Sequence, residues 1–254
     1  MAAPIVCGVD GSVPARNAAR LGAALAGRLG SELRLVHVGE PAAGAALLAD
    51  VRSRVGAPAA SLRVERGRAA DRLAAAGDRA RLLVVGGGDV PPWSGRVRGA
   101  LARRAPCPLV VVPPVPALGG HSVLCGVRDL ADAPAAALAA DLAERLALPL
   151  TLVHVLQASS GPPAAVGVLD RPWEEGDALR LLESMAHGAS TRVLTGAAAR
   201  ELARMAAAER AALLVVGTPR HAASTAAFLL RRSPRPLVVW RRRPARRAES
   251  WPCT

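Results

Sequence analysis

The chain contains no lysine and no tyrosine, and it has a single phenylalanine. Without lysine it can hold neither a Walker A phosphate-binding lysine nor a Schiff-base or kinase-type lysine, so those classes of enzyme are excluded. The scarcity of aromatic side chains leaves little that could stack on nucleic-acid bases. The hydrophobic core must therefore be built from alanine, leucine and valine.

All of the positive side-chain charge comes from arginine, with 33 basic residues against 20 acidic ones and a formal net charge of +13. A lysine-free chain rich in alanine, arginine, glycine and proline is typical of a GC-rich genome, which accounts for part of this charge. A basic surface still attracts polyanions in a salt-dependent way. No recognition-helix or stacking motif accompanies it, so sequence-specific binding of nucleic acid is not expected.

Neither secretion nor membrane insertion is indicated. The four cysteines form no CxxC pair, and Cys7 and Cys125 lie in apolar runs typical of a core, which fits a reducing cytosol better than a disulfide framework. The N-terminus lacks a basic segment followed by a long apolar one, so no signal peptide is expected. Prolines and glycines break the uncharged stretch 105–127, which cannot be one spanning helix. We therefore expect a cytoplasmic protein that does not contact a membrane.

The chain repeats itself. Four apolar motifs of the first half return in the same order in the second half: IVCGV (5–9) as VLCGV (123–127), LRLVHV (33–38) as LTLVHV (150–155), LLVVG (82–86) as LLVVG (213–217), and PLVVV (108–112) as PLVVW (236–240). Conserved order and content with variable spacing indicate an internal duplication, so the chain carries two copies of one structural unit.

Each copy alternates short β-branched runs with stretches rich in alanine and leucine. Leu21, Leu25 and Leu29 recur at helical spacing, with Ser12 as the expected cap and Gly30 as the stop. The second copy repeats this spacing in a helix for which Asp132 is the expected cap. Runs such as LLVVG are apolar on both faces, as in the interior of a parallel sheet covered by helices. The predicted order of each copy is strand, helix, strand, weak strand, helix, strand, helix, strand, a doubly wound α/β domain.

The expected architecture is two tandem doubly wound, Rossmann-like or flavodoxin-like domains over 1–117 and 118–243, followed by an arginine-rich tail, 244–254, expected to be disordered. The linker, 113–121, is too short to let the copies drift apart. The last strand of each copy begins after a proline, which suits a sheet edge. Because edges invite pairing, we expect the copies to associate through these terminal strands as a pseudo-dimer.

The motifs VCGVDGS, LRLVHV, LLVVGG and CPLVVVP, with an Ala/Leu-rich helix after the first, resemble those of the universal stress protein family, and the chain resembles a tandem member. The resemblance implies a mostly parallel five-stranded sheet in each domain and a stress-response regulator or binding module. It also implies an unidentified protein partner and ATP or another adenine nucleotide as the ligand of some members only. No metal is expected beyond nucleotide-bound Mg²⁺.

In nucleotide-binding members of that family an Asp after the first strand and a Val ending LVHV hold the adenosine, and here these are Asp10 and Val38. The phosphates lie on a loop of pattern Gly-x2-Gly-x9-Gly-(Ser/Thr), whose glycines let backbone N–H groups approach the phosphates. Gly86 begins this loop, Gly95 takes the third glycine position four residues early, and Arg96 replaces the hydroxyl. The candidate nucleotide-binding residues are therefore Asp10, Val38, Gly86, Gly95, Arg96 and Val97.

Two interpretations of this altered loop stay open. Arg96 and Arg98 could meet phosphate oxygens and replace the missing donors. Alternatively, the shortened loop with its Pro-Pro-Trp run, 91–93, could close the pocket, and Asp89 would repel phosphate. Asp10 likewise has two interpretations, as a ribose ligand or as a turn former that caps the following helix.

The second copy departs further from the nucleotide-binding pattern. Arg128 stands where the first copy has Asp10, and no further glycine follows Gly217, although Ser224 and Thr225 keep hydroxyls. Nucleotide binding is therefore expected in the first domain only, with the second as its partner domain.

No enzyme site is recognised. His37 and His154 share one strand position without acidic partners and are expected to be structural, and no GxSxG elbow is present. Slow ATP hydrolysis stays open. Two other functions also stay open: a structural or protein-interaction module with collapsed pockets, and a non-specific polyanion binder that acts through the arginine-rich C-terminus.

Overall fold

The computed structural model describes residues 3–87, 94–114, 119–156, 174–185, 188–218 and 224–241. The strands are β1 (Ile5–Gly8), β2 (Leu33–Val38), β3 (Ser61–Glu65), β4 (Leu82–Gly86), β5 (Leu109–Val112), β6 (Val123–Gly126), β7 (Leu150–Leu156), β8 (Ser190–Thr195), β9 (Leu213–Thr218) and β10 (Leu237–Arg241). The α-helices are α1 (Val13–Leu29), α2 (Pro41–Arg54), α3 (Ala69–Ala76), α4 (Ser94–Arg104), α5 (Ala133–Leu146), α6 (Glu175–Met185), α7 (Ala198–Ala208) and α8 (Ser224–Arg232). Two short 3₁₀ helices, η1 (Gly77–Arg79) and η2 (Leu130–Asp132), precede β4 and α5.

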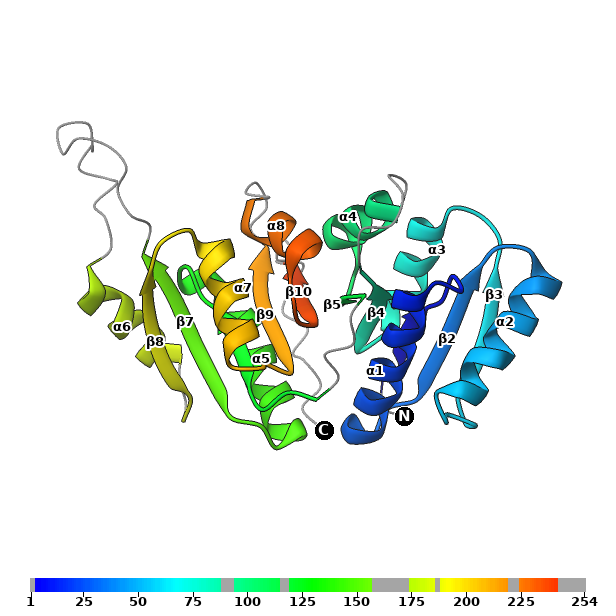
Figure 1. The fold of residues 1–254 in the computed structure, drawn as a ribbon, viewed down its shortest axis with the longest axis horizontal. Coiled ribbons are helices and arrows are strands. Elements are labelled where there is room, and N and C mark those ends of the chain that lie inside the picture. The colour runs from blue at the N-terminus through cyan, green and yellow to red at the C-terminus, as the bar shows by residue number, and fades with distance from the viewer. Residues whose placement is uncertain are drawn as a thin grey trace.

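The ten strands form one continuous sheet in the order β3-β2-β1-β4-β5-β10-β9-β6-β7-β8 (Figure 1). Every neighbouring pair is parallel except β5 and β10, which are antiparallel. Each half of the chain therefore supplies a five-stranded parallel sheet of the same topology, and the fold is the predicted tandem α/β architecture.

Helices cover both faces of the sheet, and each covered face is one hydrophobic cluster that runs through both halves. One cluster joins α1, α2, α5 and α6 to strand residues such as Cys7 and Val215. The other joins α3, α4, α7 and α8 to the alternate strand residues, among them Val6 and Leu214. Strands buried on both faces have to be apolar throughout, which is why LLVVG could be recognised in both halves.

The first helix begins and ends where the sequence predicts. Ser12 Oγ accepts the backbone N–H of Ala15 at 3.2 Å, and Gly30 ends the helix in the left-handed conformation at φ 60°. The prediction for the second copy is wrong in one respect. Asp132 directly precedes α5 but makes no capping bond to it, because its carboxylate instead accepts the N–H of Arg128 at 3.0 Å.

The predicted element order also misses one helix in each copy: α6, between β7 and β8, in the second copy, and α2 in the first. Between β2 and β3 the chain forms α2, whereas the sequence was expected to run from strand to weak strand. Neighbouring parallel strands require a crossover connection, which α2 supplies. Its buried residues, Gly44, Leu48 and Val51, are diluted by alanine, so the helical period is weak. The usable signal is the pair Glu40–Pro41, since the Glu40 carboxylate accepts the N–H groups of Ala42 and Ala43.

The two halves meet along a seam formed by β5 and β10, as their proline-preceded edges predicted. Leu237 pairs with Val111 and Val239 with Leu109. On one face α1 packs against α5, and on the other α4 packs against α8. Burying both terminal strands leaves β3 and β8 as the outer edges of the sheet.

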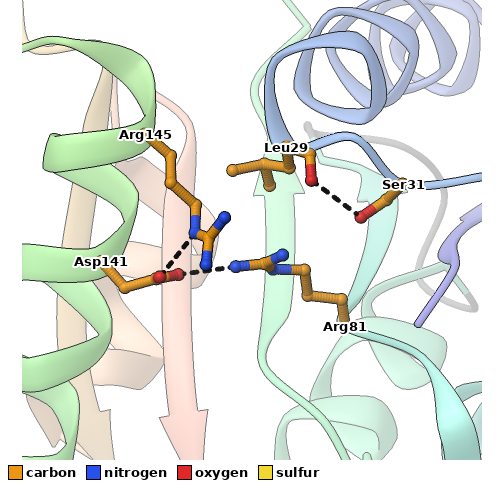
Figure 2. Close-up of polar contacts among 5 residues, drawn as sticks. All are labelled: Leu29, Ser31, Arg81, Asp141 and Arg145. Atoms are coloured by element: carbon orange, nitrogen blue, oxygen red, sulfur yellow. Dashed lines mark hydrogen bonds and ion pairs between the residues drawn. The ribbon is translucent and has the colours of Figure 1, made fainter. Parts of the chain in front are cut away.

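An ion cluster fixes one side of this seam (Figure 2). Asp141 on α5 accepts a hydrogen bond from Arg81 at 2.9 Å and another from Arg145 at 2.6 Å. Arg81 precedes β4 of the first half, so this bond links the two halves, and its side chain is only 12% exposed. Arg28 adds a second link by donating to the carbonyl of Leu146 at 3.0 Å.

Among the helices that the structure describes, none is long and apolar enough to cross a membrane. The predicted domain boundary at 117/118 and the predicted tail, 244–254, lie outside the described residues.

Candidate functional site

The topology defines one candidate site in each half. In the order β3-β2-β1-β4-β5 the connections reverse direction between β1 and β4, and in the second half they reverse between β6 and β9. Ligands of open α/β sheets bind at such switch points, outside the carboxyl ends of the strands. Asp10, Val38 and Gly86 lie at or just after the carboxyl ends of β1, β2 and β4, so the chain brings these three to the same edge of the sheet.

Asp10 forms a local turn in front of α1. Its Oδ1 accepts the N–H of Ser12 at 3.0 Å, an interaction within the exposed β1–α1 loop. The turn-forming interpretation of Asp10 is therefore correct for one carboxylate oxygen. The residue is exposed, and its Oδ2 takes part in none of the hydrogen bonds among the described residues. One oxygen remains available to a ligand hydroxyl.

Val38 presents backbone groups beyond the end of β1. The ladder between β1 and β2 ends with the bond from Val9 N to Val36 O at 2.8 Å, and Gly39 N donates to Glu65 O on the β3 side at 2.9 Å. Because successive residues of a strand direct their peptide groups to opposite sides, the N–H and C=O of Val38 face the β1 side, past Val9. A donor and an acceptor on one residue that point to the same side can recognise the edge of a purine base.

His37 keeps the carbonyl of Val9 occupied. Its Nδ1 lies 2.7 Å from that oxygen, which can only accept, so Nδ1 carries the proton. Glycines at 39 and 44 make room for the ring, since a Cβ at Gly39 would collide with Nε2. His154 repeats the arrangement at 3.0 Å from Val127 O, and its burial lowers the pKa of the imidazole. Both histidines are structural groups at a strand end, as expected.

Gly86 is required by close packing against α1. A Cβ at this position would lie 2.6 Å from Ala15 N and 2.6 Å from the carbonyl carbon of Pro14. The glycine that the sequence assigned to a phosphate loop therefore also lets the first turn of α1 reach β4. The next residue, Gly87, continues the edge by donating to Val112 O at 2.6 Å.

The remaining candidates lie at the start of α4. Gly95 and Arg96 belong to its first turn, and the structure describes no side chain for Arg96. Val97 is half-buried and packs against the core cluster of that face. Arg98 donates from Nη1 to Leu230 O of α8 at 3.2 Å. The structure thus directs Arg98 to the seam, which argues against a role in replacing phosphate donors.

A small cavity of about 80 Å³ lies at the seam, where Gly87 and Val111 face Leu229 and Ser233. Ligand sites for drug-sized molecules occupy roughly 300–1,000 Å³, so this cavity is too small for a nucleotide. Within the described ranges, no three residues among the histidines, cysteines, aspartates and glutamates gather as metal ligands do.

The buried thiols are unreactive. Burial raises the pKa of Cys7 to about 12 and also raises the pKa of Cys125. Both cysteines are fully buried in strands, as predicted for core residues. Because the thiolate is the reactive form, neither can act as a nucleophile at neutral pH.

The second switch point is occupied by the chain's own charges. Arg128 is exposed and donates from Nε to Asp129 at 3.1 Å. Asp132 is buried, and a Cβ added to Gly217 would collide with its Oδ1. The carboxylate therefore lies between the ends of β6 and β9, where a phosphate would otherwise approach. The sequence predicts Asp132 only as a helix cap; the signal for its role at the switch point is the additional acid in the run RDLADAP.

Asp132 makes a pH-dependent contribution to stability. Burial raises the pKa of its carboxyl above the ordinary 3.8, so folding is less favourable when the group is ionised. This penalty is absent below the unfolded pKa and fully present once the pH exceeds the folded pKa. Asp132→Asn keeps an oxygen for the Arg128 N–H. It should raise the free energy of unfolding at pH 7 by about 1 kcal/mol, the low end of the desolvation penalty of a buried group.

Urea unfolding of both proteins between pH 3.5 and 8 would measure this gain, which should shrink as the pH falls towards 3.8. Asp78→Asn changes the same charge at an exposed position and serves as the control. A loss of stability at pH 7 in Asp132→Asn would mean that the ionised carboxylate stabilises the fold.

The model of a family described as the universal stress protein family matches residues 1–94 and 121–241. No curated protein matches the chain.

Solved structures share the whole architecture. A universal stress protein from Archaeoglobus fulgidus is 15% identical, with 94% of this chain and 98% of that chain covered at a TM-score of 0.69. A putative universal stress protein from Pseudomonas aeruginosa is 17% identical; the match covers 94% of this chain and 92% of that chain, with a TM-score of 0.66. The cytoplasmic domain of a prokaryotic cation chloride cotransporter is 10% identical; the match covers 94% of this chain and 95% of that chain, with a TM-score of 0.53. The fold thus occurs in proteins of different roles, so function has to be argued from the site.

Proposed function

The chain belongs to the universal stress protein family, and from this membership we propose that it is a stress-response binding module that recognises an adenine nucleotide in its first domain only. The second domain is its permanent partner. The domains are proposed to span 1–117 and 118–243. The proposal includes no catalytic step, and it places the protein in the cytoplasm.

The difference between the two switch points is the observation that carries this proposal. In the first half, the Val38 peptide faces the space beyond β1, and Asp10 is exposed with one oxygen free of the local turn. In the second half, the same region holds the Arg128–Asp129 pair and the buried carboxylate of Asp132. A backbone donor and acceptor with a nearby carboxylate suit a base and a ribose, whereas a buried carboxylate opposes phosphate.

The described residues fit the adenosine part of the ligand better than its phosphates. In the first turn of α1, Ala15 N–H is taken by Ser12, and Pro14 has no N–H to offer. This helix end is therefore a poor phosphate site, and phosphate donors would have to come from Gly95, Arg96 and Val97 at the start of α4. We propose that base and ribose provide most of the affinity and that ATP, ADP and AMP differ little.

Ligand-linked thermal unfolding tests this proposal. A nucleotide at roughly a hundred times its dissociation constant stabilises the native state by about 2.7 kcal/mol. For a chain of this length that corresponds to an increase in Tm of about 5–10 °C. We expect such an increase with millimolar ATP, ADP or AMP, measured by differential scanning fluorimetry or calorimetry. No increase with any of the three would contradict the proposal.

Asp10→Asn is the informative variant because its amide oxygen can still accept the Ser12 N–H and keep the turn. The basal Tm should stay within about 2 °C, since exposed substitutions usually change stability by less than 0.5 kcal/mol. The ligand-induced increase should largely disappear, because ribose hydroxyls lose a charged acceptor. The matched control is Arg128→Gln at the second switch point, which should keep the full increase.

A structural or interaction role without nucleotide is the second candidate. The Asp10–Ser12 turn and the filled second switch point favour it, since both satisfy polar groups from within the chain. Mass spectrometry of the small molecules released when the purified protein is denatured separates the two candidates.

A further inference from the structure

The two helical layers differ sharply in charge. The helices of the first layer, α3, α4, α7 and α8, cover one face of the sheet. They carry nine arginines (72, 96, 98, 103, 104, 200, 204, 231 and 232) and two acids (71 and 201). The opposite layer carries seven arginines (16, 20, 28, 52, 54, 145 and 180) and six acids (50, 141, 144, 175, 177 and 183). The first layer is therefore strongly basic, and the second is almost neutral.

Arginine-rich composition does not account for this difference. A uniform compositional bias would raise the arginine content of both layers equally, whereas the first layer has nine arginines in 39 helical residues and the opposite layer has seven in 56. Nor does favourable placement at helix C-termini account for it, because both layers have arginine in last turns, such as Arg28 and Arg104. The first layer is both richer in arginine and poorer in carboxylates, and α4 and α8 contain no carboxylate at all.

The basic charge is concentrated across the seam. The helices pack in the order α3, α4, α8, α7, with α4 against α8 at the centre (Figure 1). Arg103 lies in the last turn of α4 in the run RRAP, and Arg231 and Arg232 end α8 in the corresponding run RRSP. All three are exposed, and no carboxylate among the described residues forms an ion pair with them. Arg104, by contrast, pairs with Asp71 at 3.1 Å.

We propose that this basic layer, defined as α3, α4, α8 and α7, is a docking surface for double-stranded nucleic acid. It binds the phosphate backbone and does not distinguish between bases. Guanidinium groups bind phosphate oxygens bidentately, and contacts of this kind supply most non-specific affinity for a duplex. The surface spans both halves, so it exists only when the halves are joined.

The lack of exposed large apolar side chains on this layer favours a duplex over other polyanions. The exposed large hydrophobic residues of the described chain are Val13 and Leu130, which lie outside these helices. An acidic protein needs an apolar centre to its interface, and a lipid surface needs side chains that insert. A single strand needs exposed aromatic platforms for its bases, and the one aromatic residue of these helices, Phe228, is partly buried and packs against the core. A duplex backbone requires positive charge alone.

The test compares two full-length variants with equal loss of charge. Arg103, Arg231 and Arg232 are changed to glutamine in one, and Arg20, Arg54 and Arg180, which are exposed on the opposite layer, in the other. Both retain the arginine-rich segment 242–254, so its contribution is constant. The probe is a mixed-sequence duplex of about 30 base pairs, roughly 100 Å long, followed by fluorescence anisotropy across salt concentrations.

The basic-layer variant should bind the duplex at least about tenfold more weakly at 50 mM salt, and its log–log salt slope should fall by about 2–3. The opposite-layer variant should stay within about threefold of the wild type. Equal losses in both variants would overturn the proposal in favour of net charge alone. Failure of the wild type to bind the duplex, or tighter binding of polyglutamate, anionic vesicles or single-stranded oligothymidine, would overturn it as well.

Discussion

Gly86→Ala should lower the free energy of unfolding by about 3 kcal/mol or more, which is the range of severe single substitutions. The added methyl would lie 2.6 Å from two backbone atoms of α1, Ala15 N and the carbonyl carbon of Pro14. Backbone in the first turn of a capped helix cannot rotate away, so α1 or β4 has to shift. Because α1 packs on both β4 and β5, the shift would reach the seam. Urea denaturation followed by far-UV circular dichroism measures the loss.

Two other glycine substitutions provide reference values for the loss of stability expected in Gly86→Ala. Gly217→Ala at the corresponding strand end meets the Asp132 side chain rather than backbone, so rotation of one carboxylate relieves part of the clash and the loss should be smaller. Gly27→Ala meets nothing within 4 Å on an exposed position of α1 and should add about 0.5–1 kcal/mol through helix propensity. A Gly86→Ala protein as stable as the wild type would refute the close packing of α1 on β4.

Asp141→Ala should lower the free energy of unfolding by about 2 kcal/mol. The change leaves the Arg81 guanidinium, whose side chain is 12% exposed, without its carboxylate at the seam. Removing one partner of a buried pair costs about 3–5 kcal/mol, and the 28% exposure of Asp141 reduces that figure by allowing solvent to screen the charge. Denaturant unfolding at low salt is the appropriate measurement.

A double-mutant cycle isolates the pair. Arg81→Ala with Asp141→Ala should destabilise the fold by less than the sum of the single changes, because the second substitution removes the unpaired charge that the first leaves. Asp50→Ala breaks the exposed pair with Arg54 and should cost no more than about 0.5 kcal/mol. Strict additivity at positions 81 and 141 would show that the contact in Figure 2 contributes nothing to the joining of the halves.

The sequence predicted those parts of the fold that depend on local burial. Strands apolar on both faces, such as LLVVG, can lie only inside a covered parallel sheet, and the proline before each last strand indicated an edge. The helix α2 was missed because alanine on every side of it hides the helical period. The ten-stranded continuity follows from pairing those two edges, and the comparison with solved structures supports the same architecture.

The candidate site was less accessible to sequence reasoning because its chemistry depends on contacts between distant residues. The bond from Arg98 to the carbonyl of Leu230 joins residues 132 positions apart, and it redirects an arginine that the sequence offered to phosphate. Asp132 looked like a cap, and only the approach of β9 reveals that it occupies the switch point. The roles of Asp10 and Val38 as nucleotide ligands stay predictions.

The antiparallel pairing of β5 with β10 also fixes a stoichiometry. Two separate single-domain chains of different sequence could combine in three ways, two of like with like and one of unlike, in proportions set by how much of each is synthesised. Here the unlike combination is encoded in one polypeptide, and the edges of β5 and β10 are already paired with each other. Every molecule therefore contains one half that keeps Asp10 at its switch point and one half whose switch point is filled by Asp132, whatever the level of expression.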